Sequence, residues 1–197
     1  KQLRQLSISY RKTYVHPADH ATYYPGATQL SMKLLFAPDG RLLGAQAIGR
    51  EGVDKRIDVI AAVMRMGGTV ADLEELELGY APPYSSAKDP VNILGFTAAN
   101  ILNGSMPVVY AEELEDRLQD ALLLDVRTAA EARGGGISGA MQIPVDELRE
   151  RIGELPAGRP VILYCAVGLR GYIAQRILLQ QGIEAYNLSG GYKTYQM

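Results

Sequence analysis

Strand-like and helix-like segments alternate in the second half of this 197-residue chain, and this alternation constrains the fold more than any other feature. Short apolar runs at residues 122–126, 161–165 and 185–188 are separated by helix-like segments near 146–152 and 171–181. Parallel strands need long crossover connections, which helices usually supply. The pattern therefore predicts an α/β unit with a parallel central sheet that helices cover on both faces.

The first half has strands followed by helices, which is the order of an α+β domain with an antiparallel sheet. Alternating apolar residues over 30–36 predict a half-buried strand, and Pro38-Asp39-Gly40 predicts a turn into a partner strand at 42–48. The segment Asn103-Gly104-Ser105-Met106-Pro107 is typical of a join between domains. We expect a first domain at 1–104, a linker at 105–107 and a second domain at 108–197.

Helical spacing and capping residues predict three helices in the first half. One runs from Val53 to Met66, and a short one starts at Thr69 with Asp72 in a capping box. The last starts at Asp89-Pro90, with Asp89 as the cap. The apolar face expected for the first of these helices consists of Val53, Ile57, Ile60, Ala61 and Met64.

The composition excludes several classes of protein. With 20 basic and 22 acidic residues the net charge is -2, so we expect neither nucleic acid nor a membrane as partner. No apolar run approaches the roughly 20 residues that span a bilayer. A single cysteine excludes an internal disulfide and a cysteine-based zinc cluster, so we expect no metal site and a reducing, cytoplasmic location. Strand-like sequence follows directly from Lys1, so we expect that an upstream part is missing.

Cys165 follows a buried-strand run and precedes a short loop that leads into an amphipathic helix. Ligands bind at such strand ends in parallel sheets. If the loop curls, its amides and the helix N-terminus favour an anion, and the same field favours a nucleophilic thiolate. Gly168 permits the positive φ that a closed loop needs. We therefore expect Cys165 to be catalytic, with an anion-binding loop made of Ala166, Val167, Gly168, Leu169, Arg170 and Gly171.

Two other interpretations of Cys165 compete with this one. Free cysteine is often a small buried hydrophobe without chemistry. Here, however, Cys165 lies at a strand end and is followed by a glycine, an arginine and a helix start, a combination that favours a reactive cysteine. A cysteine phosphatase or arsenate reductase needs a loop one residue longer than the four residues between Cys165 and Arg170. The spacing therefore favours a smaller anion than phosphate.

Residues 108–197 resemble a rhodanese domain, a sulfurtransferase module that carries a persulfide on its active-site cysteine. Besides the Cys165 loop, the resemblance rests on residues 124–127 with Glu131, on residues 139–144 and on Leu188-Ser189-Gly190-Gly191. It implies that Cys165 accepts a sulfane sulfur and that the loop amides stabilise the persulfide anion. It also implies that Arg170 holds the loop or an anionic donor.

Asp125 and Arg127 are expected to support the site as a structural ion-pair network, with Glu131 four residues after Arg127. The chain departs from the rhodanese pattern at two places. Gly136 stands where many rhodaneses have histidine, and Tyr192 and Tyr195 stand where a tryptophan often follows the glycine pair. These departures leave the substrate open.

Residues 3–104 resemble the C-terminal dimerisation domain of flavin-dependent pyridine nucleotide-disulfide reductases, above all the rhodanese-fused coenzyme A disulfide and persulfide reductases. The resemblance rests on residues 20–26 and 80–92. It implies a homodimer through residues 1–104, in which Tyr80 and either Tyr23 or Tyr24 approach the partner's flavin site. The competing interpretation is that these tyrosines are ordinary core or interface aromatics.

No Gly-x-Gly-x-x-Gly fingerprint follows a strand here, so the resemblance implies the C-terminal portion of such an enzyme. FAD, NAD(P)H and coenzyme A are expected for the full-length enzyme and not for this fragment. We expect sulfane-sulfur transfer among small thiols and persulfides, with an external acceptor because the chain has no second cysteine. The alternative is a dimerisation and docking module without catalysis.

Overall fold

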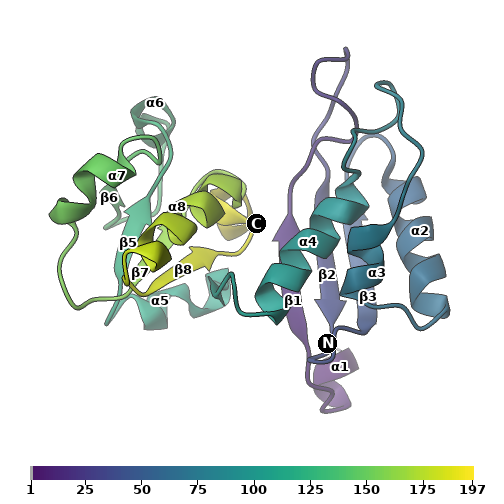
Figure 1. Ribbon diagram of the computed structural model, residues 1–197, viewed down its shortest axis with the longest axis horizontal. Coiled ribbons are helices and arrows are strands. Elements are labelled where there is room, and N and C mark those ends of the chain that lie inside the picture. The colour runs from purple at the N-terminus through teal and green to yellow at the C-terminus, as the bar shows by residue number, and fades with distance from the viewer. Residues whose placement is uncertain (1) are drawn as a thin grey trace. The chain divides into compact units, whose positions relative to one another are not determined.

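The computed structural model describes residues 2–197, which form two compact units that divide between Asn103 and Gly104 (Figure 1). We call them the first and the second unit. Each has its own sheet, antiparallel in the first and parallel in the second. The predicted fold class, an α+β domain followed by an α/β domain, is confirmed. The limits 1–104, 105–107 and 108–197 remain a prediction.

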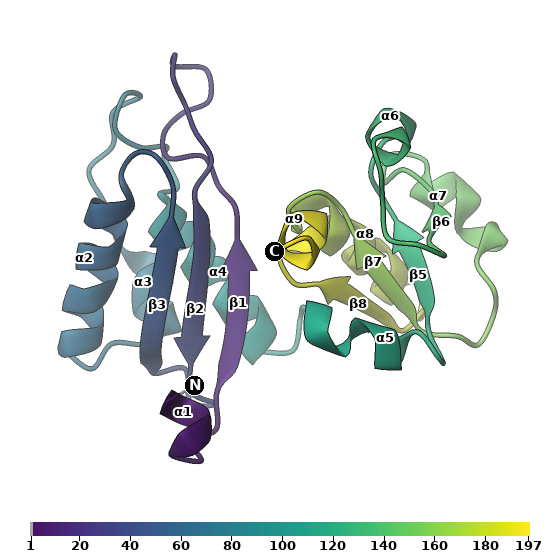
Figure 2. The same cartoon turned by 180° about the vertical axis from the view of Figure 1, so that it is seen from behind.

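The sheet of the first unit has three strands in the order β1-β2-β3. They are β1 (Arg11–Val15), β2 (Ser31–Phe36) and β3 (Leu42–Ile48). Every second residue of β2 is buried, so the expected half-buried strand and its hairpin partner are confirmed. Figure 2 shows one face of this sheet, and the helices at residues 70–75 and 90–102 lie behind it.

Four helices belong to the first unit: α1 (Gln2–Gln5), α2 (Val53–Arg65), α3 (Val70–Glu75) and α4 (Pro90–Leu102). The predicted capping box at Thr69 is confirmed, and so is Asp89 as the cap of α4. The apolar face expected for α2 is wrong in part, because Ala61 is exposed and the buried residues are Arg56, Ile60 and Val63. A buried arginine, which a count of apolar residues ignores, takes part in this face.

The second unit has a five-stranded parallel sheet in the order β4-β8-β7-β5-β6. Its strands are β4 (Val108–Val109), β5 (Leu122–Asp125), β6 (Met141–Gln142), β7 (Val161–Tyr164) and β8 (Ala185–Leu188). β7 lies in the middle of the sheet, which explains why all four of its residues are buried.

The helical segments of the second unit are η1 (Ala111–Glu113), α5 (Leu114–Arg117), α6 (Ala129–Arg133), α7 (Leu148–Arg151), η2 (Ile152–Glu154), α8 (Leu169–Gln180) and α9 (Gly191–Tyr195). The helix after Cys165 starts at Leu169 and not at Gly171 as expected. Leu169, Arg170 and Gly171 therefore lie in the first turn of α8, which shortens the free loop to residues 166–168. Within residues 2–197 no helix is long and apolar enough to cross a bilayer.

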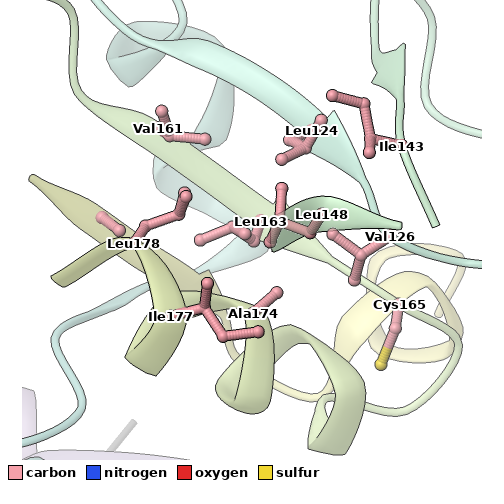
Figure 3. Close-up of a cluster of buried hydrophobic side chains, with 11 residues drawn as sticks. Leu124, Val126, Ile143, Leu148, Val161, Leu163, Cys165, Ala174, Ile177 and Leu178 are labelled. Carbon is pink, nitrogen blue, oxygen red and sulfur yellow. The ribbon is translucent and has the colours of Figure 1, made fainter. Parts of the chain in front are cut away.

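Alternation along β7 assigns its side chains to two different cores. Val161, Leu163 and Cys165 belong to the cluster that includes Ala174 and Ile177 of α8. Ile162 and Tyr164 belong to the cluster on the opposite face. Figure 3 shows Cys165 at one end of the first cluster, beyond Val126. The sulfur thus continues a row of core side chains to the carboxyl end of the sheet.

Candidate active site

Cys165 is the residue that follows β7, and only 1% of it is exposed. Its sulfur accepts a hydrogen bond from the backbone N–H of Gly168 at 3.1 Å. The loop therefore curls back on the sulfur, which the sequence analysis took only as a condition, and Gly168 does adopt a positive φ of 106°. Ala166 and Val167 are half-buried between these two residues.

Helix α9 holds the other side of this loop. The N–H groups of Tyr192 and Lys193 donate to the carbonyl oxygens of Cys165 at 2.8 Å and of Ala166 at 3.0 Å. No described peptide bond is cis, and in a trans peptide the C=O and N–H point in opposite directions. The N–H groups of Ala166 and Val167 are consequently directed away from α9. The Gly168 N–H, which reaches the sulfur, is the donor of this loop that favours a negative charge there.

Arg170 forms a bidentate ion pair with Glu131 of α6. Its two terminal nitrogens lie 2.7 and 2.6 Å from the two carboxylate oxygens. This pairing, together with hydrogen bonds from Thr128, lowers the pKa of Glu131 to about 2. The pKa of Arg170 is raised, chiefly by Glu131 and to a smaller extent by Cys165. Arg170 is thus paired with the carboxylate, and its charge also interacts with the Cys165 thiol.

Arg127 and Asp125 form a second, more deeply buried pair. The Arg127 Nη2 atom lies 2.6 Å from Asp125 and also donates to the carbonyl oxygen of Gly135 at 2.8 Å. The guanidinium lies against the rings of Tyr192 and Tyr164, 4.6 and 5.3 Å from their centroids. The hydrogen bonds that Arg127 donates to Asp125 raise the pKa of Arg127. These contacts describe a network that stabilises the fold.

The expected proximity of Arg127 and Glu131 is wrong, because Glu131 pairs with Arg170. The reason is local. Thr128 caps α6, so Arg127 lies outside that helix and the four-residue spacing does not bring the two side chains together along one helical face.

In the first unit, the hydroxyls of Tyr23 and Tyr80 are hydrogen-bonded to each other. Both rings are exposed, Tyr23 by 74% and Tyr80 by 48%. The bond to Tyr80 raises the pKa of the Tyr23 hydroxyl. Tyr24 is also exposed but packs edge-on against His20. Of the two tyrosines that the sequence leaves open, Tyr23 is the one joined to Tyr80.

Comparison with known families decides what these two units are. Residues 1–90 match the model of the pyridine nucleotide-disulphide oxidoreductase dimerisation domain, and residues 110–197 match that of the rhodanese-like domain. The chain joins a dimerisation domain to a rhodanese-like domain.

Solved structures and curated proteins contain the same pair or part of it. The structure of reduced Bacillus anthracis CoADR-RHD is 45% identical, with a TM-score of 0.96, and the match covers 98% of this chain and 35% of that one. A NAD-dependent persulfide reductase from A. fulgidus is 34% identical, with a TM-score of 0.89 over 98% of this chain and 36% of that one. Coenzyme A disulfide reductase of Staphylococcus epidermidis is 44% identical over 93 residues, 47% of this chain.

This chain spans 21% of the length of that Staphylococcus protein. A literal Gly-x-Gly-x-x-Gly run does occur at residues 134–139, but it lies between α6 and β6. A dinucleotide fingerprint requires the opposite order, strand then helix. The rhodanese-like domain therefore has no phosphate-binding turn of that kind there. Among residues 2–197 no group of three or more His, Cys, Asp or Glu side chains could hold a metal ion.

The sequence analysis missed a residue of the dimerisation domain that organises both tyrosine-bearing loops. Arg56 is 2% exposed, lies 3.0 Å from Asp89 and donates to the carbonyl oxygens of Asp19 at 2.6 Å and Tyr84 at 3.3 Å. It thus links the segment that leads to Tyr23 with the segment after Tyr80. Its helical spacing from Val53 and Ile60, on the buried side of α2, could have revealed it.

Proposed function

We propose that the chain transfers sulfane sulfur through a persulfide on Cys165, as the C-terminal portion of a flavin-dependent coenzyme A disulfide or persulfide reductase. The observation that carries the proposal is the curled loop over Cys165, with the Gly168 N–H at 3.1 Å from the sulfur. Backbone donors so placed stabilise a thiolate and the persulfide that replaces it. The relatives' names support the same class of chemistry.

The proposed transfer has two steps that balance without an added oxidant. The Cys165 thiolate attacks the outer sulfur of a donor persulfide, the donor S–S bond breaks, and the donor leaves as a thiolate. An acceptor thiolate then attacks the outer sulfur of the Cys165 persulfide, and the Cys165 thiolate is restored. The chain has one cysteine, so the acceptor is another molecule.

The chain's own residues have distinct parts in this reaction. Gly168 offers its backbone N–H to the negative sulfur, and α9 holds the peptides of Cys165 and Ala166 in place. We propose that the N–H groups of Ala166 and Val167 add to this stabilisation. Arg170 and Gly171 lie in the first turn of α8, whose N-terminus follows the same loop. Asp125, the last residue of β5, and Arg127 stabilise the carboxyl end of the sheet by their ion pair.

FAD and NAD(P)H would belong to parts of the full-length enzyme outside this chain, and no step above passes through them. A bound flavin would supply the reduction of a disulfide or persulfide. We further propose that the dimerisation domain forms a homodimer and presents the Tyr23–Tyr80 pair to the partner's flavin site. Sedimentation should give a dimer at micromolar concentration, and a monomer there would contradict this proposal. The single cysteine fits a reducing, cytoplasmic location.

The test of sulfur transfer is the intact mass of the chain after brief exposure to a low-molecular-weight persulfide or to thiosulfate. We expect a gain of one sulfur, which cyanide or excess thiol removes and which Cys165→Ser abolishes. The folded Cys165→Ser chain, checked by circular dichroism, is the control. A folded wild-type chain that gains no sulfur from either donor would overturn the proposal.

One observation favours a docking module instead. Cys165 is 1% exposed, as expected of a core cysteine without chemistry. The two functions differ in thiol reactivity at neutral pH. A sulfur carrier should react with a small alkylating agent in the folded state, whereas a docking module should react only upon unfolding.

A further inference from the structure

The stretch that follows Cys165 carries one charged side chain, and its charge interacts with the Cys165 thiol. Between Cys165 and Gly171 the sequence has Ala, Val, Gly, Leu and then Arg170. The preference of the loop for donors of one charge over another thus depends on whether the positive charge of the Arg170 guanidinium is neutralised.

Glu131 neutralises the positive charge of that guanidinium. Both carboxylate oxygens of Glu131 lie within 2.7 Å of the terminal nitrogens of Arg170, in the planar geometry that Arg–carboxylate pairs favour. Glu131 also accepts hydrogen bonds from the N–H and hydroxyl of Thr128 at 3.0 and 2.8 Å. These contacts fix its position, and its low pKa keeps it ionised at neutral pH. The net charge of the pair beside the sulfur is zero.

The surface next to this pair is apolar. Leu169 and Ile173 lie one helical turn apart on α8 and are 66% and 43% exposed. Val167, in the loop itself, is half-buried. An aliphatic donor arm that packs on these side chains would gain free energy, whereas a sulfonate would lose hydration there.

We propose that Glu131 determines donor specificity: by neutralising Arg170 it makes the Cys165 loop select persulfides with an uncharged aliphatic arm over small dianions such as thiosulfate. This inference rests on the proposed sulfur transfer. With a thiol persulfide the leaving group is a thiolate, and with thiosulfate it is sulfite. In both cases one S–S bond breaks and one forms at Cys165. The donors differ in the charge that the loop must accept.

The test compares the rates at which Cys165 gains sulfur from thiosulfate and from the persulfide of N-acetylcysteamine, followed by intact mass. Glu131→Gln keeps the size of the side chain and can still accept from Thr128, but it leaves Arg170 with an uncompensated positive charge. We expect the ratio of the thiosulfate rate to the persulfide rate to rise about three- to tenfold, the range of a partly exposed charge interaction. The rise should shrink in 1 M salt.

Three further variants separate specificity from a purely structural effect. Arg170→Gln leaves Glu131 unpaired, so the ratio should fall, and the double variant Glu131→Gln/Arg170→Gln should return to the wild-type ratio. Glu150→Gln, an exposed glutamate of α7, removes the same charge elsewhere and should leave the ratio unchanged.

The inference is overturned if folded Glu131→Gln shows the wild-type ratio, or if the double variant keeps the ratio of Arg170→Gln alone. If Glu131→Gln does not fold but the double variant does, the comparison of Arg170→Gln with the double variant still decides the question. If neither Glu131→Gln nor the double variant folds, a role of Glu131 limited to specificity is contradicted. A wild-type chain that loads from neither donor overturns the proposed function itself, which distinguishes the two failures.

Discussion

The backbone N–H of Tyr192 lies 2.8 Å from the carbonyl oxygen of Cys165. This hydrogen bond joins the first turn of α9 to the residue that carries the thiol. Gly191, directly before Tyr192, has a φ of 63° and lies so close that a Cβ atom would come within 2.5 Å of the same carbonyl oxygen. The loop over the sulfur thus depends on a residue that is 26 positions away in the sequence.

Gly191→Ala should therefore destabilise the chain and abolish sulfur loading at Cys165. Its Cβ would collide with backbone atoms, which cannot rotate away as a side chain can, and alanine at positive φ adds about 1–2 kcal/mol of strain. We expect a loss of at least about 2 kcal/mol in urea unfolding. Gly139→Ala is the matched control, since its φ is 79° but nothing lies within 4 Å. Equal losses in both variants would contradict this account.

The Glu131–Arg170 pair should make stability depend on pH in a defined direction. The folded-state pKa of Glu131 is about 2, below its usual value of 4.5, so its contribution is complete above pH 4.5 and is lost as pH falls towards 2. At pH 7 we expect Glu131→Gln to be about 1 kcal/mol less stable than wild type, because the pair is partly exposed and screened. Urea unfolding at pH 7, 5 and 3 should show this difference shrink by pH 3. A constant difference would show that charge is not its cause.

Two cations near Asp89 should differ sharply in their effect on stability. Arg56 is buried and lies 3.0 Å from the carboxylate, whereas Lys55 is 40% exposed and lies 3.7 Å from it. Arg56→Ala should cost about 3–5 kcal/mol in urea unfolding, since it leaves Asp89 buried without this partner. Lys55→Ala should cost less than about 1 kcal/mol. Similar losses would mean that Arg56 does not hold the two tyrosine loops together.

Gly136, which stands where many rhodaneses have histidine, should resist even the smallest side chain. A Cβ there would lie 3.0 Å from both the Arg127 Nη2 and the Tyr164 hydroxyl, which are held by their own contacts. We expect Gly136→Ala to lower the free energy of unfolding by about 1 kcal/mol. Gly153→Ala, with open space around it, should be neutral or slightly stabilising. A neutral Gly136→Ala would show that Arg127 can move aside.

Local sequence patterns predicted the following strand and helices correctly. The alternation over 30–36 yields β2, the capping box at Thr69 starts α3, and Asp89 with Pro90 starts α4. Such signals act between residues a few positions apart, so the sequence shows them directly. The start of α8 was expected two residues too late, because a helix can begin directly after a glycine of positive φ without a polar cap.

The amino-acid sequence was sufficient to predict the two fold classes and the place of Cys165 at the carboxyl end of a buried strand, whereas the curl of its loop entered only as a condition. The tertiary structure alone decided the partners: Glu131 for Arg170, Tyr23 for Tyr80, and Asp89 for Arg56, which are 39, 57 and 33 residues apart. Secondary structure follows from short-range periodicity and turn chemistry, whereas an ion pair or hydrogen bond across elements depends on how those elements pack. The same pattern of apolar residues is compatible with many pairings of polar side chains. Only the packing of the sheets and helices brings particular partners together.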